Sequence, residues 1–178
     1  VESNDMLKIA LLGIGNMGKN HLRILSMLKG VEICSIFDVN ESELKKLSAQ
    51  YNVPYTLNMD EAIEGVDAVL IVTSTSTHFD YFSKCVGKVK NIFVEKPLAT
   101  TYEDACLMEE LACKHQTFVQ CGFIERFNPV VSALKNVLSE REVINMDFTR
   151  TNRLSSRISD VDVVLDLMIH DLDLALFF

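Results

Sequence analysis

Residues 8–18 read Lys8-Ile-Ala-Leu-Leu-Gly13-Ile-Gly15-Asn-Met-Gly18, an apolar run that leads into three glycines with the spacing G-x-G-x-x-G. Gly13 allows a sharp turn off a strand, Gly15 lets a pyrophosphate approach the backbone, and Gly18 lets the next helix pack closely. The N-terminus of that helix presents unpaired N–H groups and the positive end of its dipole to phosphates. The stretch predicts a dinucleotide-binding loop, although three glycines alone can also form an ordinary tight turn.

An acidic residue twenty positions beyond the last glycine strengthens this interpretation. Asp38 follows the run Val31–Phe37, which reads as a second parallel strand. Its carboxylate can accept hydrogen bonds from the adenosine ribose and would repel a 2′-phosphate. Val39 and Asn40 follow, with no arginine for that phosphate, so the sequence favours NAD over NADP. Capping of the helix that begins near Glu41 is a second, compatible role for Asp38.

Composition limits the classes of partner. The chain has 178 residues, 48% of them hydrophobic, and a net charge of −8, which argues against nucleic acid or an anionic membrane as partner. No apolar run reaches the roughly eighteen residues that a membrane span needs. The five cysteines have no C-x-x-C spacing and lie mostly in apolar patterns, so we expect reduced core residues in a cytoplasmic protein. They are Cys34, Cys85, Cys106, Cys113 and Cys121.

Strand and helix patterns alternate along the first two thirds of the chain. After the strand before Gly13, strands are expected at residues 31–37, 68–72, 91–95 and 117–121, and helices at 19–29, 41–50, 60–64, 78–86 and 102–114. In the first helix, Leu22, Ile24, Leu25 and Leu28 are expected to cover the sheet. The regular alternation predicts an α/β fold, a doubly wound parallel sheet with helices on both faces.

Ligands in open α/β sheets bind beyond the carboxyl ends of the strands, so the loops there are candidate sites. The loop Thr73-Ser-Thr-Ser-Thr-His78 offers small hydroxyl residues that can approach a cofactor, although helix capping also explains several of them. Glu95-Lys96-Pro97 follows another strand. Pro97 biases Lys96 toward an extended conformation, which would hold its ammonium group at the sheet edge.

The pattern changes after residue 122, where we expect a second domain. Gly122–Pro129 leads into a helix at 130–138 and an alternating strand at 143–149. Residues 150–157 then carry three arginines and no acid. This segment is either a solvated surface loop or a grip for a phosphorylated or carboxylated substrate, and the sequence favours neither.

The last segment, residues 161–178, contains a second cluster of polar residues. On a helix, Asp166, His170 and Asp173 lie at i, i+4 and i+7 and share a face, with an apolar face opposite. That apolar face consists of Leu165, Met168, Ile169, Leu172 and Leu176. A carboxylate one turn from a histidine can orient it as a general base, which is the favoured role. A structural histidine or a metal site are the alternatives.

These motifs occur in the order typical of one family. The glycine loop with His21, the loop ending in His78, Glu95-Lys96-Pro97, Gly122-Phe…Arg126-Phe-Asn-Pro129 and Asp166-x-x-x-His170 resemble the glucose–fructose oxidoreductase/inositol dehydrogenase (Gfo/Idh/MocA) family. The resemblance covers essentially the whole chain. It implies a Rossmann NAD-binding domain (1–122) and the start of an α+β substrate domain with an open sheet (123–178), and NAD(P)-linked oxidation or reduction of a sugar or polyol.

The resemblance also assigns roles to residues. It places Lys96, Asp166 and His170 around the reacting carbinol, with metal playing no part. Candidate cofactor-binding residues are Gly13, Gly15, Asn16, Met17, Gly18, Asp38, Thr73, Ser74, Thr75, His78, Glu95 and Lys96. Candidate substrate-binding residues are Arg126, Asn128, Arg153, Arg157 and Asp173. Ser74 stands where members often have proline.

Within the family, the segment from Arg157 to Asp171 looks most like the UDP-N-acetylglucosamine 3-dehydrogenase branch, with Asp162 in place of that branch's glycine. A sugar-nucleotide substrate would give the arginines at 150, 153 and 157 a purpose. A polyol dehydrogenase of the inositol type and a non-catalytic NAD-binding sensor are the alternatives. The sensor would have no reason to keep Lys96 and His170.

The sequence ends at Phe178, inside a helical pattern. Family members continue for well over a hundred residues, so the resemblance implies a truncated chain. It also implies a homo-oligomer, a dimer or tetramer, because the missing part usually supplies the oligomer interface.

Overall fold

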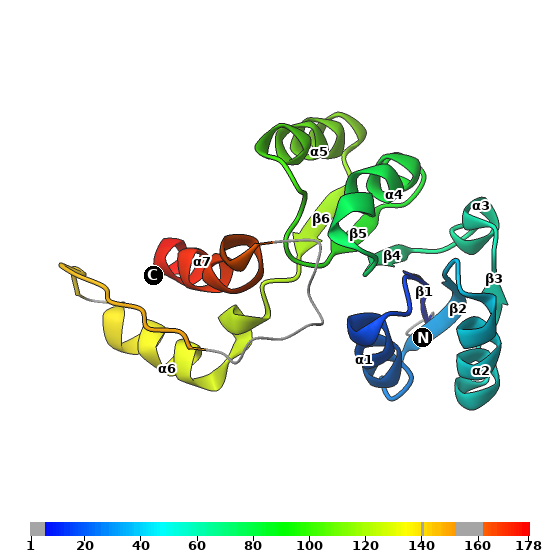
Figure 1. Cartoon of the computed structure of the whole chain (residues 1–178), viewed down its shortest axis with the longest axis horizontal. Coiled ribbons are helices and arrows are strands. Elements are labelled where there is room, and N and C mark those ends of the chain that lie inside the picture. The colour runs from blue at the N-terminus through cyan, green and yellow to red at the C-terminus, as the bar shows by residue number, and fades with distance from the viewer. Residues whose placement is uncertain (1–5, 140, 152–161) are drawn as a thin grey trace, which may run out of the picture. The chain divides into compact units, whose positions relative to one another are not determined.

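The computed structural model describes residues 6–139, 141–151 and 162–178. The chain divides into two compact units, Val1–Cys121 and Gly122–Phe178 (Figure 1). The division lies beside the expected boundary after residue 122. That the second unit begins a substrate domain stays a prediction.

The first unit is built on a six-stranded sheet. Its strands are β1 (Leu7–Leu12), β2 (Val31–Phe37), β3 (Tyr55–Thr56), β4 (Ala68–Ile71), β5 (Asn91–Val94) and β6 (Phe118–Cys121). They lie in the order β3-β2-β1-β4-β5-β6, and neighbouring strands are parallel. The predicted doubly wound parallel sheet is confirmed. The order reverses between β1 and β4, the point at which ligands bind in such folds.

Five α-helices cover the two faces of this sheet. They are α1 (Asn16–Leu25), α2 (Glu41–Tyr51), α3 (Met59–Ala62), α4 (His78–Cys85) and α5 (Tyr102–His115). One core cluster joins Ile9 and Leu11 to α1 and α2, whereas Ala10 and Leu12 pack with α3, α4 and α5. This division follows from the alternation of side chains along a strand, which sends successive residues to opposite faces.

Helix α1 ends at Leu25, four residues earlier than predicted. Leu22 is buried, whereas Ile24 and Leu28 are exposed, so the predicted apolar face is only partly correct. The chain forms a turn after Leu25 and reaches Gly30, whose φ of 80° suits glycine, just before β2.

The second unit consists of short helices in its described part. They are the 3₁₀ turn η2 (Ile124–Phe127), α6 (Pro129–Leu138), the π-helical turn η3 (Val164–Met168) and α7 (Ile169–Phe177). The predicted strand at 143–149 is wrong, because residues 142–151 have no regular secondary structure. An extended segment becomes a strand only by hydrogen bonding to another, and the described residues of this unit offer no such partner.

The apolar face predicted for residues 161–178 is only partly buried, because Leu165 and Ile169 are half-buried. Met168, Leu172 and Leu176 are exposed, whereas Asp173 and Leu174 are buried. The side of α7 that carries Asp173 turns inward because the Asp173 carboxylate binds a guanidinium group within the same unit, as described below.

The cysteines are free thiols, but they do not all lie in the core. Cys85 is buried, Cys34, Cys106 and Cys121 are half-buried, and Cys113 is exposed. The expectation of core cysteines is therefore correct for Cys85 only. Burial raises the pKa of the Cys85 thiol to about 12, which keeps it protonated at neutral pH.

Candidate cofactor and substrate site

The glycine loop follows β1 and has the geometry that its three glycines require. Gly13 has a φ of 95°, and a Cβ there would lie 2.5 Å from the carbonyl oxygen of Val72. A Cβ on Gly18 would lie 2.1 Å from the carbonyl oxygen of Gly13, so only glycine lets α1 pack this closely. Gly15 is different, because a Cβ there would have no heavy atom within 4 Å. This open position at the N-terminus of α1 fits a pyrophosphate approaching the backbone.

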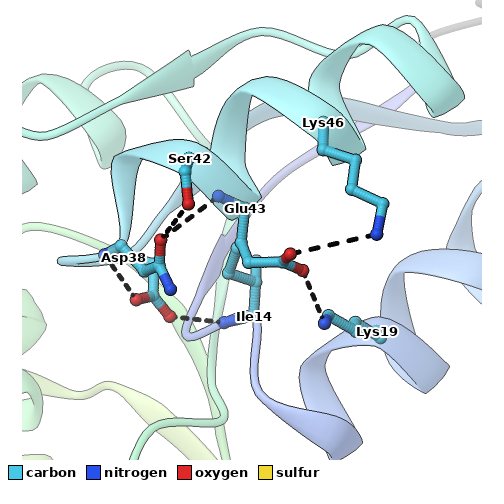
Figure 2. A network of polar contacts seen from close by, with 7 residues as sticks. Ile14, Lys19, Asp38, Ser42, Glu43 and Lys46 are labelled. Carbon is cyan, nitrogen blue, oxygen red and sulfur yellow. Dashed lines mark hydrogen bonds and ion pairs between the residues drawn. The ribbon is translucent and has the colours of Figure 1, made fainter.

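Asp38 lies beside this loop, at the carboxyl end of β2. Its carboxylate accepts hydrogen bonds from the backbone N–H of Ile14, at 2.8 Å, and of Asn40, at 2.9 Å (Figure 2). It therefore holds the glycine loop in place, and its contact with an adenosine ribose stays a prediction. The N-cap of α2 is Asn40, whose side chain accepts from the N–H of Glu43, so the predicted capping role belongs to Asn40.

A network of charges links the first turns of α1 and α2 close to Asp38 (Figure 2). Lys19 donates to the carboxylate of Glu43 at 2.7 Å, and Lys46 lies 3.9 Å from the same group. The hydrogen bond from Lys19 lowers the pKa of Glu43. The pair fixes the helix that begins at the glycine loop relative to the helix that follows Asp38.

Thr73 and Ser74 lie in the loop after β4, and Thr75 begins the 3₁₀ turn η1 (Thr75–Thr77). Ser74 is exposed, whereas Thr75 is buried. The hydroxyl of Thr77 bonds to the hydroxyl of Thr73, at 2.9 Å, and to the carbonyl of Ser74. These bonds fix the loop backbone at the sheet edge, where a cofactor is expected.

His78 is 1% exposed and holds two loops together. Its Nδ1 lies 2.9 Å from the carbonyl oxygen of Pro97, and its Nε2 lies 3.1 Å from that of Thr73. With both ring nitrogens directed at backbone carbonyls, the geometry favours an indirect role at the cofactor site. His78 positions the loops after β4 and β5, and the proposed direct contact with a cofactor has no support in this geometry.

Lys96 lies at the carboxyl end of β5, half-buried, and is joined to Pro97 by a cis peptide bond. The carboxylate of Glu95 accepts from the backbone N–H of Lys96 at 3.0 Å and lies 2.6 Å from Nε2 of His21 on α1. The sequence motifs predict no contact for His21. Its contact with the sheet could nevertheless have been predicted from its position three residues after Gly18. That position lies one turn along the helix, on the side that faces the sheet.

In the second unit, two predicted substrate-binding residues bind each other. Nε of Arg126 lies 2.9 Å from Oδ2 and 3.1 Å from Oδ1 of Asp173, which is 6% exposed. Asn128 caps α6 by accepting from the N–H of Val130. These contacts give Arg126, Asn128 and Asp173 structural roles that the sequence did not predict. Because Asp173 is engaged by a cation, the geometry also argues against the Asp/His/Asp metal alternative.

Arg150 is the one arginine of the 150–157 segment that lies in the described residues. It forms bonds of 2.8–3.1 Å with the carboxylate of Asp171 and lies 3.8 Å from Glu125. The hydrogen bond to Asp171 raises the pKa of Arg150. Its charge is balanced within the unit, which does not support the substrate-grip interpretation for this residue. Arg153 and Arg157 lie outside the described residues.

Asp166 lies in the π-helical turn η3, and His170 lies in the first turn of α7. Both side chains are half-buried. They belong to the second unit, whereas Lys96 belongs to the first. That the three residues meet at one nicotinamide ring stays a prediction.

Two features are absent from the part of the chain that the structure describes. No group of three or more histidine, cysteine, aspartate or glutamate side chains there is arranged to hold a metal ion. No helix there has the length and apolar character needed to cross a membrane.

Comparisons with known proteins place this architecture in a family. The family described as "Oxidoreductase family, NAD-binding Rossmann fold" matches residues 7–123. The chain is 28% identical over 177 residues to inositol 2-dehydrogenase of Acidothermus cellulolyticus, covering 94% of this chain and 52% of that protein. It is also 28% identical over 170 residues to UDP-N-acetylglucosamine 3-dehydrogenase of Acidithiobacillus ferrooxidans, covering 96% and 53%.

A solved structure of that UDP-N-acetylglucosamine 3-dehydrogenase is similar to this chain, with a TM-score of 0.83 at 26% identity. The similarity covers 97% of this chain and 56% of the solved one. The chain thus spans about half the length of the curated relatives it matches. From the matched residues, the glycine loop and the parallel sheet, we conclude that the chain belongs to the Gfo/Idh/MocA family of oxidoreductases with an NAD-binding Rossmann fold.

Proposed function

We propose that this chain is the cofactor-binding part, and the beginning of the substrate-binding part, of an NAD-dependent dehydrogenase that oxidises a secondary alcohol of a sugar. The observation that carries the proposal is the set of groups at one edge of the first sheet. The open position at Gly15, the carboxylate of Asp38 and the ammonium-bearing Lys96 follow β1, β2 and β5 at their carboxyl ends. This is where a dinucleotide and its substrate bind in such folds.

The proposed reaction divides the work between cofactor and protein. NAD would be held by the glycine loop and Asp38, and it would supply the hydride acceptor for the substrate carbon. Lys96 hydrogen-bonds the substrate hydroxyl, and either His170 or Lys96, the latter acting as a neutral amine, removes the hydroxyl proton, leaving a carbonyl. In the second case Asp166 orients the imidazole and stabilises its cation.

We infer a sugar nucleotide of the UDP-N-acetyl type as the substrate. Support comes from the likeness of nearly the whole chain to a UDP-N-acetylglucosamine 3-dehydrogenase and from the segment that leads to His170. Arg150 no longer supports this inference, because Asp171 and Glu125 balance its charge. Inositol-type polyols are the second candidate, supported by equal sequence identity to an inositol 2-dehydrogenase.

A substrate screen tests the proposed function. The full-length gene product is incubated with NAD and, separately, with UDP-N-acetyl sugars, sugar phosphates and free inositols, and NADH is followed at its absorbance band. We expect turnover with a UDP-N-acetyl sugar. Turnover with inositols alone would move the substrate to the second candidate, and NAD binding without turnover on any of them would favour a sensor.

The preference for NAD over NADP rests on Asp38. In Asp38→Asn, the side-chain oxygen can still accept from Ile14, whereas the acceptor for the N–H of Asn40 and the charge that repels a 2′-phosphate are both lost. We expect the ratio of NADPH to NADH affinity to rise by about tenfold, or about 1.4 kcal/mol. Titration of nucleotide fluorescence measures both constants without any substrate.

Asp67→Asn is the matched control for Asp38→Asn. The Asp67 carboxylate also accepts a backbone N–H, that of Lys8 at 2.9 Å, but it lies at the amino end of the sheet. Its replacement should leave the ratio of the two affinities unchanged. A ratio unaltered in Asp38→Asn would remove Asp38 from the ribose site.

A further inference from the structure

Glu95 is a buried carboxylate with two partners in different elements. It is 6% exposed and directly follows β5. Its Oε1 lies 2.6 Å from Nε2 of His21 on α1, and its Oε2 accepts the backbone N–H of Lys96 at 3.0 Å. The ring of His21 packs edge-on against Phe93 of β5, with centroids 5.3 Å apart, so the imidazole itself is held in orientation.

We propose that Glu95, held by His21, is a positioning residue for Lys96. The inference rests on the proposed function of Lys96 and deepens it. A carboxylate shielded from water is stabilised only when its oxygens are paired, so the two contacts fix the position of Glu95. One of these contacts is the main chain of Lys96, and the lysine backbone is fixed with it.

The contact between Glu95 and His21 connects the lysine to the cofactor-binding helix. His21 belongs to α1, whose N-terminus is the glycine loop. The contacts of His21 and Glu95 therefore connect helix α1 to Lys96. Helix α1 is expected to hold the pyrophosphate, and Lys96 is expected at the nicotinamide. Reacting groups need placement within a fraction of an ångström, and a misplacement of about 1 Å lowers rates by about 10²-fold.

A double-mutant cycle separates positioning from a general structural role. Glu95→Ala is made in the wild-type and in the Lys96→Met background of the full-length protein. A residue that acts through Lys96 has no effect once the ammonium is absent. We expect Glu95→Ala to lower turnover by about 10- to 100-fold in the wild-type background and by less than about twofold in Lys96→Met, on the scale of such misplacements. Equal losses in both backgrounds overturn the proposal.

Two further variants keep the test decisive if Glu95→Ala folds poorly. Glu95→Gln preserves shape and one acceptor oxygen for the N–H of Lys96, so it should retain most of the turnover. His21→Ala removes the second contact and should lower turnover with a nearly unchanged dissociation constant for NAD. A Glu95→Gln protein as impaired as His21→Ala, or a His21→Ala protein with full turnover, overturns the proposal.

Amide exchange tests the contact without catalysis. The Lys96 N–H should exchange at least about tenfold faster in Glu95→Ala, because it loses its acceptor, while the N–H of Val94 in the β5 ladder keeps its rate. An unchanged Lys96 rate overturns the positioning role. If Lys96→Met keeps full turnover, it is the proposed function of Lys96 that fails, and the exchange result still reports whether Glu95 holds this backbone.

Discussion

Replacing Lys96 with methionine is expected to lower turnover by about 10²–10⁴-fold, the usual contribution of a general acid–base group. Methionine keeps an unbranched, apolar side chain of similar length and removes only the ammonium group. Lys96 stands at the carboxyl end of β5, next to a carboxylate that holds its backbone. The site should therefore keep its shape while losing the group that hydrogen-bonds the substrate hydroxyl.

The dissociation constant for NAD should stay nearly unchanged in Lys96→Met, because the glycine loop and Asp38 supply the binding. Stopped-flow or steady-state production of NADH with the substrate found in the screen gives turnover, and nucleotide fluorescence gives affinity. Lys90→Met is the matched control, since Lys90 is exposed and precedes β5 at its amino end. Full turnover in Lys96→Met would remove Lys96 from the reaction.

The same measurements in His170→Asn address the identity of the base. Asparagine can hydrogen-bond but cannot take up the proton that an imidazole accepts. If His170 is the base, its replacement lowers turnover as much as Lys96→Met does and flattens the dependence of the rate on pH. If Lys96 is the base, His170→Asn has the smaller effect and the pH dependence stays.

The sheet and the glycine loop could be predicted because their signals are local. Continuous apolar runs such as Ala68–Ile71 mark strands that are covered on both faces, although Ala68 and Leu70 are only half-buried, and glycine spacing indicates the loop that follows β1. The two-residue strand β3 was missed, since Tyr55 and Thr56 carry no periodic pattern of their own. They join the sheet only because β2 offers them an edge.

The second unit was predicted less well because its structure depends on contacts between distant residues. Arg126 and Asp173 are 47 positions apart. Each was predicted to bind substrate, because the local sequence around a charged residue does not show which distant residue it pairs with. In the 143–149 segment, apolar and polar residues alternate as they do in a strand. This alternation predicts on which side of a strand each side chain would lie, but it does not supply the neighbouring strand whose backbone the segment would need for hydrogen bonds.

The first unit shows the same limit at its site. Asp38 was predicted from its distance to the glycines, but its bond to Ile14, 24 positions earlier, was not. Glu95 and His21, 74 positions apart, each stood in a recognised motif, yet only the folded sheet shows that they are partners. Local spacing thus predicted where ligands should bind, whereas the groups that hold those residues in place come from pairings set by the topology.

Replacing Gly18 with alanine is expected to destabilise the first unit by about 3 kcal/mol or more, at the upper end of overpacking effects. The added Cβ would lie 2.1 Å from the carbonyl oxygen of Gly13, and neither backbone can yield without moving α1 off the sheet. Because the same movement displaces the N-terminus of α1, affinity for NAD should fall with stability. Urea unfolding and nucleotide titration measure the two effects.

Gly15→Ala separates the two effects. A Cβ at Gly15 meets no heavy atom within 4 Å, and the residue has an ordinary negative φ of −62°, so the free energy of unfolding should change by less than about 1 kcal/mol. The methyl group nevertheless enters the space where the pyrophosphate must approach, and NAD affinity should fall by at least about tenfold, or about 1.4 kcal/mol.

A stable Gly15→Ala protein that binds NAD normally would contradict the proposed phosphate position. An unstable one would contradict the open geometry of the loop. Only loss of binding without loss of stability agrees with a loop in which Gly13 and Gly18 serve the fold and Gly15 serves the ligand.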